Sequence, residues 1–176
     1  MWYTPSLIEF RSVIETMMHD PDILAMSHVR QHVQGVTRLD HSMSVAYLSF
    51  CLCRKLRLNA CAAARAGLLH DLDSCHWRDS GNISVWQHIR QHPKTCMENA
   101  KAHGLSALEQ DIILKHMWPL TLTKLPRHRE SFVVNFADKL CYAAEISRLC
   151  RFIRAYRWLE EMVFEFMSLI PAPAAI

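Results

Sequence analysis

Apolar residues recur along most of this chain at the three- and four-residue spacing of helices, and no stretch alternates with the period of two typical of strands. Residues that start and stop helices divide the pattern into segments. Thr4-Pro5 opens a first helix that Asp20-Pro21 ends, and a short second helix covers about 22–31. The sequence therefore predicts an all-α fold.

The middle of the chain predicts two helices with many apolar positions. Asp40 is expected to cap the first of them, and Asn59 is expected to cap an alanine-rich helix that ends at His70-Asp71. The polar segment 73–84, which follows directly, is expected to be a loop. A polar stretch thus begins where the most apolar helix ends.

The last part of the chain predicts four more helices. One begins at His92-Pro93 and closes before Gly104, since glycine suits the left-handed position after a helix. Ser106 begins a Ser-x-x-Glu capping box at the start of the next. The expected limits of the remaining helices are Ser106 to His116, about 130 to 147, and a C-terminal helix to about 167.

Composition restricts the class of protein. The 176 residues are 51% hydrophobic and 21% charged, which fits one globular domain. A net charge of +3 is too small for a dedicated nucleic-acid binder but suits an anionic small substrate. Seven cysteines without a Cys-x-x-Cys pair predict reduced packing residues. No signal peptide and no run of roughly 18–20 apolar residues is found, so we expect a cytoplasmic protein without a membrane span.

The adjacent pair His70-Asp71 carries the most chemical information. It follows the small-residue run 60–69, which predicts a buried helix. Two ionisable groups at the end of such a helix cost several kcal/mol unless a partner compensates them, and a bound cation is the simplest partner. Further candidates are spread over about a hundred residues: His41, His92, His116 and Asp138.

In this order the residues resemble the HD-domain superfamily of metal-dependent phosphohydrolases. The family pattern is a His, an adjacent His-Asp pair, optional further His residues and a final Asp, and here both optional residues are present. The resemblance covers about residues 35–146. It implies one HD domain over residues 1–176, a compact helical bundle with the N-terminal helices and a C-terminal helical extension packed on it.

The resemblance also implies a binuclear metal centre. A carboxylate has two oxygens, so Asp71 is best suited to bridge two metals. His41, His70 and Asp138 would then bind the first metal and His92 and His116 the second, with Asp71 and His70 as catalytic residues. A mixed set of nitrogen and oxygen ligands suits Fe, Mn, Zn, Co or Ni better than calcium.

The sequence does not decide which of two histidines is one of the ligands. His88 lies four residues before His92 and could share a helix face with it, but Pro93 disfavours helical geometry at residue 92. Family members often have His-Pro at this point, which favours His92. The choice between His88 and His92 stays open.

Basic residues near these positions are candidates for binding phosphate. They are Arg38, Arg78, Lys94, Lys115 and Lys139. Two departures from known branches bear on the substrate. Leu72-Asp73 stands where many relatives have Ile-Gly-Lys, and no Gly-Tyr-Pro follows His116, which argues against a cyclic-di-GMP phosphodiesterase.

The sequence therefore predicts a metal-dependent phosphohydrolase that cleaves a phosphate ester or anhydride, with a nucleotide as the expected substrate, by a metal-activated water. Two metals about 3.5–4 Å apart lower the pKa of such a water. The ligand set resembles that of HD-type diadenosine tetraphosphate hydrolases more than that of single-metal nucleotidases. The alternatives are an HD-type mixed-valent di-iron oxygenase and a non-enzymatic helical regulator. The oligomeric state stays open, a homodimer being one option.

Overall fold

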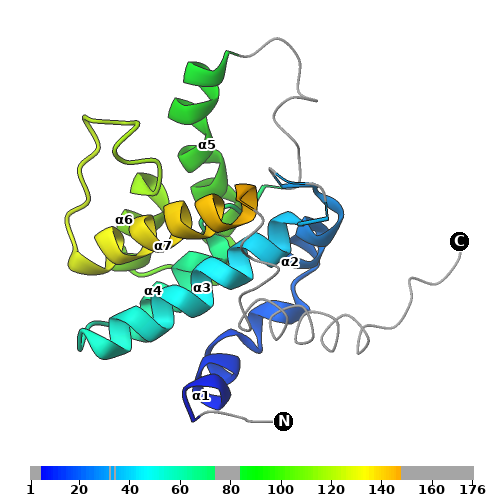
Figure 1. The fold of residues 1–176 in the computed structure, drawn as a ribbon, viewed down its shortest axis with the longest axis vertical. Coiled ribbons are helices and arrows are strands. Elements are labelled where there is room, and N and C mark those ends of the chain that lie inside the picture. Colours follow the sequence, from blue (N-terminus) through cyan, green and yellow to red (C-terminus); the bar gives the residue numbers. More distant parts are fainter. Residues whose placement is uncertain (1–4, 32, 34, 74–83, 148–176) are drawn as a thin grey trace, which may run out of the picture.

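The computed structural model describes residues 5–31, 33, 35–73 and 84–147 (Figure 1). Within these residues the chain forms helices and no β-strand, apart from one isolated β-bridge between Arg30 and Thr37. The predicted all-α fold is therefore confirmed. The elements are α1 (Pro5–Ile14), η1 (Met17–His19), α2 (Pro21–Ala25), η2 (Met26–His28), α3 (Arg38–Lys55), α4 (Ala60–Leu69), α5 (Val85–Asn99), η3 (Ala100–His103), α6 (Ala107–Lys115) and α7 (Arg129–Ile146).

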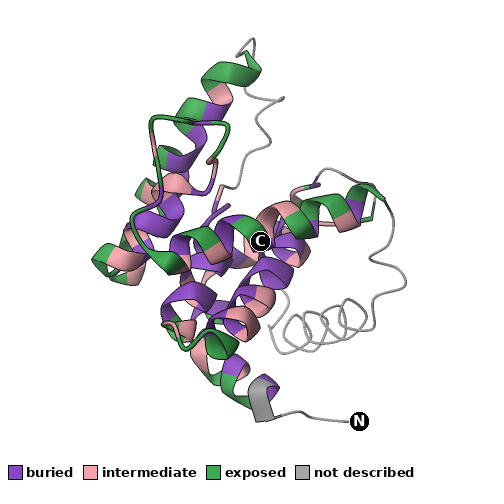
Figure 2. Cartoon of the chain, turned by 60° about the vertical axis from the view of Figure 1, so that its left-hand side comes forward, coloured by how far each residue is buried: buried purple, intermediate pink, exposed green. Residues whose placement is uncertain are grey.

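The pair α3 and α4 forms the centre of the molecule, and α7 packs against α3, α4 and α6. Buried residues gather in the centre of the cluster and exposed residues on its outer faces (Figure 2). Gly67 permits the close approach of α4 to α3, because a Cβ at this position would lie 2.9 Å from Cα of Ala46. The alanines of α4 add little bulk, so α4 can be buried along most of its length.

The start of α3 corrects one prediction. Thr37, and not Asp40, is the N-cap residue, while Asp40 occupies the third helical position. The Oδ2 atom of Asp40 accepts hydrogen bonds from the Thr37 amide (2.8 Å) and hydroxyl (2.6 Å). The helix begins earlier than expected because Thr37 and Asp40 form a capping box together. Arg38 is therefore in the first turn and His41 one position beyond Asp40.

The start of α5 corrects a second prediction. The helix begins at Val85, capped by a box of Ser84 and Gln87, and continues through Pro93. Proline removes one backbone hydrogen bond inside a helix, yet the cap and the buried face around Ile89 hold the flanking turns. The Ser-x-x-Gln spacing was the signal for this earlier start.

Most other helix limits agree with the sequence. The Asn59 side chain accepts from the Ala62 amide at 3.0 Å, Gly104 has a left-handed φ of 62°, and Ser106 caps α6, as predicted. The first two predicted helices are shorter than expected. Their C-terminal parts are the separate 3-10 turns η1 and η2.

Several predictions lie outside the described residues: most of the loop 73–84, the C-terminal helix and Arg78. The prediction of one domain over residues 1–176 therefore stays a prediction. In the part of the chain that the structure describes, no helix is both long and apolar enough to cross a membrane. The five cysteines described there form no disulfide.

Candidate metal centre

One cavity of about 440 Å³ collects the predicted chemistry. It lies where the first turns of α3, the residues after α4 and α6, and the middles of α5 and α7 meet. All six candidate ligands line it, although they come from five separate stretches of sequence: His41, His70, Asp71, His92, His116 and Asp138.

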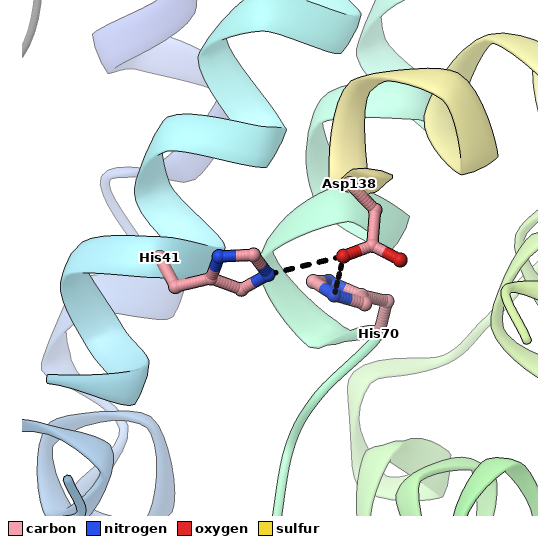
Figure 3. Close-up of side chains that lie close together, drawn as sticks. All are labelled: His41, His70 and Asp138. Atoms are coloured by element: carbon pink, nitrogen blue, oxygen red, sulfur yellow. Dashed lines mark hydrogen bonds and ion pairs between the residues drawn. The ribbon is translucent and has the colours of Figure 1, made fainter. Parts of the chain in front are cut away.

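Three of these side chains form a first cluster, shown in Figure 3. His41 from α3, His70 from the end of α4 and Asp138 from α7 point toward one another. The Oδ1 atom of Asp138 lies 3.1 Å from Nε2 of His41 and 3.8 Å from Nε2 of His70. One potential ligand atom from each residue lies within 4.8 Å of the others. This spacing suits a single ion held by two imidazoles and a carboxylate.

Asp71 and His92 form a second cluster, in which one potential ligand atom of each also lies within 4.8 Å of Sγ of Cys96. The Oδ1 atom of Asp71 lies 2.6 Å from Nε2 of His92. The ring of His116 lies between the two clusters, with its centroid 5.2 Å from that of His70 and 5.3 Å from that of His92. The second oxygen of Asp71 accepts from Nε2 of Gln31 at 3.0 Å and lies 3.6 Å from Nε of Arg38.

Hydrogen bonds fix the orientation of three imidazoles. Nδ1 of His70 lies 2.7 Å from the Gly67 carbonyl, and Nδ1 of His116 lies 2.7 Å from the Ile113 carbonyl. A carbonyl only accepts, so in both rings Nδ1 carries the proton and the neutral ring keeps its lone pair on Nε2. Nδ1 of His41 is held in the same way by a carboxylate, Glu145. Metal-binding histidines usually have this arrangement.

The electrostatics also suit a cation. Burial would raise the pKa of Asp138, but the hydrogen bond with His41, the neighbouring His70 and the charge of Lys139 hold it well below its usual range. Burial would lower the pKa of His41, but its hydrogen bonds to Asp138 and Glu145 raise it to about 10, so an ion that binds Nε2 would displace a proton from this ring. Burial and the charges of His70 and His92 lower the pKa of His116 to about 3, so this ring is a neutral donor. The residues present therefore fit a divalent metal.

Comparison with known families agrees with this geometry. The family described as HD domain matches residues 38–143, well over half of the chain. The chain belongs to the HD-domain family. This superfamily includes metal-dependent phosphohydrolases, and HD domains bind divalent metals. No curated protein and no solved structure matches the chain.

In this HD domain, Nε2 of His92 lies 2.6 Å from Oδ1 of Asp71, which supports His92 as the ligand. Because α5 continues through Pro93, the two histidines do share a helix face, and their ring centroids lie 4.8 Å apart. The prediction that Pro93 separates them was wrong, since the helix accommodates the proline. His88 lines the cavity, and burial together with the charge of His92 lowers its pKa to about 4.

Cys96 is an additional neighbour of the second cluster. Its Sγ atom lies 3.6 Å from Nδ1 and 3.5 Å from Nε2 of His92. Nearly equal distances put the sulfur over the face of the ring, because a position in the ring plane would clash with the carbon between the nitrogens. The Nε2 lone pair lies in that plane and does not point at the sulfur. Cys96 therefore packs on the face of His92, while its sulfur stays within reach of the same ligand atoms as Asp71.

Two of the predicted basic residues reach the cavity of this HD domain. Arg38 donates to the Asp73 carbonyl and lies near Asp71, while Nζ of Lys139 lies 2.8 Å from Asp138 Oδ2. Lys94 is exposed and does not line the cavity. Lys115 does not line it either, because Asp111, one helical turn earlier, holds its Nζ at 2.5 Å. These two predictions of substrate contacts are not supported by the placement.

The sequence analysis missed Gln31 and Glu145, both outside the matched segment. Gln31 follows η2, and no local pattern marks it. Glu145 lies seven residues after Asp138 in α7, which puts the two carboxylates on the same face of one helix. That spacing was a usable signal.

Proposed function

We propose that this HD domain is a metal-dependent phosphohydrolase that cleaves a phosphate ester or anhydride of a nucleotide. One observation carries the proposal: five imidazoles, four of them proposed ligands, and two carboxylates line a single cavity together with Arg38 and Lys139. A set of imidazole nitrogens and ionised carboxylates favours a divalent ion, and adjacent cationic groups favour an anionic substrate.

The proposed metal ligands fall into two sets. His41, His70 and Asp138 hold a first ion, and His92 and His116 a second, with Asp71 shared between them. When bound, such ions supply Lewis acidity, which activates a water and stabilises the charge on an attacked phosphoryl group. Asp71 and His70 are the proposed catalytic residues, since they are adjacent and face different clusters.

The cations of the wall provide phosphate binding in this proposal. Arg38 is buried, and its guanidinium is held by Gln31 and the Asp73 carbonyl. Lys139 is held by Asn135, the His116 carbonyl and Asp138. Both positive groups are thus fixed at the edge of the clusters, which reduces the entropy lost when they bind an anion. Arg30 lines the same wall at an exposed position.

The mouth of the cavity supports an organic substrate. Val85, Met117, Leu120 and Tyr142 line it, and three of them are strongly exposed: Val85 at 55%, Leu120 at 53% and Tyr142 at 41%. An inorganic phosphate chain would gain nothing from these side chains. A nucleoside would bury them, and the volume lies within the range of about 300–1,000 Å³ that small-molecule sites have.

A nucleotide screen under anaerobic conditions tests the function. We expect protein purified without chelator to release phosphate or a nucleoside monophosphate, to lose this activity with chelator, and to regain it with manganese or another divalent ion. Hydrolysis with a redox-inert ion excludes the oxygenase. Oxygen uptake in proportion to an organic product, without turnover of any phosphate ester, would favour the oxygenase. Tight metal binding with neither activity would favour the regulator.

A further inference from the structure

Glu145, in the last turn of α7, is a carboxylate with no exposed surface. A buried carboxylate is unfavourable unless a charged or hydrogen-bonding partner compensates it. Its Oε1 atom lies 2.8 Å from Nδ1 of His41, 104 residues away in the sequence. Nothing else in the chemistry described above requires a carboxylate at this position.

The position of His41 in its helix explains why it takes a carboxylate partner. His70 and His116 each follow the last residue of a helix, where carbonyls lack amide partners and can accept from the ring. His41 lies in the first turns of α3, where carbonyls are used by the helix itself, as the Thr37 carbonyl is by the His41 amide. An acceptor for its ring must therefore come from another element.

Helix α7 supplies that acceptor together with a proposed ligand. Asp138 and Glu145 are two helical turns apart on one face of α7. Asp138 lies 3.1 Å from Nε2 of His41, and Glu145 lies 2.8 Å from Nδ1. One rigid helix thus contacts both nitrogens of the same ring.

We infer that Glu145 is a positioning residue for the first metal: it keeps the proton of His41 on Nδ1 and aims Nε2 at the ion. The inference rests on the proposed metal centre and adds a residue outside the segment that matches the family. A carboxylate acceptor increases the donor strength of the imidazole more than a carbonyl does. Loss of such a partner lowers metal affinity about 10- to 100-fold.

Metal affinity of the full chain tests this role without any assay of activity. Zinc affinity is measured by competition with a chelator for the wild type, for Glu145→Gln and for the control Glu109→Gln. Glu109 is also a buried glutamate, but it pairs with Arg65 at 2.6 Å and does not line the cavity. We expect a loss of about tenfold or more for Glu145→Gln at one of the two sites, and an unchanged affinity for the control.

A double-mutant cycle with His41→Ala shows whether Glu145 acts through His41. We expect Glu145→Gln to cause no further loss of affinity when His41 is absent. An equal loss in both backgrounds overturns the inference, and so does wild-type affinity in Glu145→Gln. A wild-type chain that binds no zinc overturns the metal centre itself, which is a different result.

The role of Glu145 can also be tested on the wild type, so that the result does not depend on whether a variant folds. In the zinc-loaded protein, nitrogen NMR of labelled histidine distinguishes a ring protonated on Nδ1 from one protonated on Nε2. We expect His41 to carry its proton on Nδ1. A His41 ring protonated on Nε2 would contradict the role of Glu145 directly.

Discussion

The two clusters of the cavity differ in how firmly their side chains are held. In the first cluster, His41 and His70 each have an acceptor for Nδ1 at 2.8 Å or less, and both come from the central pair α3 and α4. Of the two histidines proposed for the second ion, His116 has such an acceptor at 2.7 Å, but Nδ1 of His92 has Asp73 Oδ2 at 3.7 Å, which is too far for a hydrogen bond. The looser hold on His92 leaves the second cluster less prearranged for an ion than the first, so we expect the first proposed site to bind its ion more tightly.

Asp71→Ala is the change with the largest expected effect, because it would remove a ligand that both proposed ions share. Asp71 is proposed to contact both ions, so the variant should lose both metals and its activity should fall to background. Metal analysis of the purified protein measures the loss. Two tightly held metals in this variant would show that Asp71 is not shared.

His92→Ala should separate the two clusters. It removes only a ligand of the second ion, so we expect one metal per chain instead of two and a large loss of activity. His41→Ala is the matched change in the first cluster and should weaken the tighter site. Equal affinities for the metals remaining in the two variants would show that the clusters do not differ.

Arg38→Ala should change substrate binding more than metal content. We expect KM to rise about 10- to 100-fold, since a hydrogen bond to a charged group contributes about 1.5–3 kcal/mol. Lys94→Ala is the control, because Lys94 is exposed and lies outside the cavity lining. Steady-state kinetics checks both. A similar rise in KM for Lys94→Ala would contradict the assignment of the cavity as the substrate site.

Gly67→Ala should affect the first cluster through the fold. The new Cβ would lie 2.9 Å from the Ala46 backbone and push α4, which leads to His70, away from α3, which carries His41. Overpacking of this kind costs about 1–3 kcal/mol. Gly104→Ala strains a left-handed residue without touching the cavity. Thermal unfolding should show losses for both variants, while only Gly67→Ala should lower the affinity of the tighter metal.

The contact of Asp111 in α6 with Ser131 in α7 should make a smaller, pH-dependent contribution to the stability of the fold. Burial would raise the pKa of Asp111, but hydrogen bonds from Lys115, the Arg127 amide and Ser131 lower it. Its stabilisation is therefore present above the ordinary pKa of about 3.8 and is lost as the pH falls through the lower folded pKa. Asp111→Asn should be less stable than the wild type at neutral pH, and the difference in unfolding free energy should shrink in acid. A constant difference would contradict this.

The sequence predicted most helices because they depend on local patterns, and the candidate ligands named from a motif lie together in one cavity, while their binding of a metal stays a prediction. Asn59, Gly104 and Ser106 act through neighbours within a few residues, and the order of the HD residues is itself a motif. The errors come from choices between local signals. Asp40 and Thr37 both can cap a helix, and Pro93 disfavours but does not forbid one.

Contacts between distant segments could not be predicted in the same way. The pair of Lys115 with Asp111 is an exception that could have been predicted, because opposite charges four residues apart on a helix commonly pair. Gln31 reaches Asp71 across forty residues, and Glu145 reaches His41 across more than a hundred. These contacts follow from how α3, α4 and α7 pack, which is a property of the whole core.

Anomalous diffraction from crystals grown with manganese tests the central claim most directly. We predict two peaks inside the cavity, one beside His41, His70 and Asp138 and one beside His92 and His116, with Asp71 between them. At limiting metal the first peak should be the stronger. A cavity without any peak at saturating manganese, or peaks only at other places on the molecule, would contradict the account.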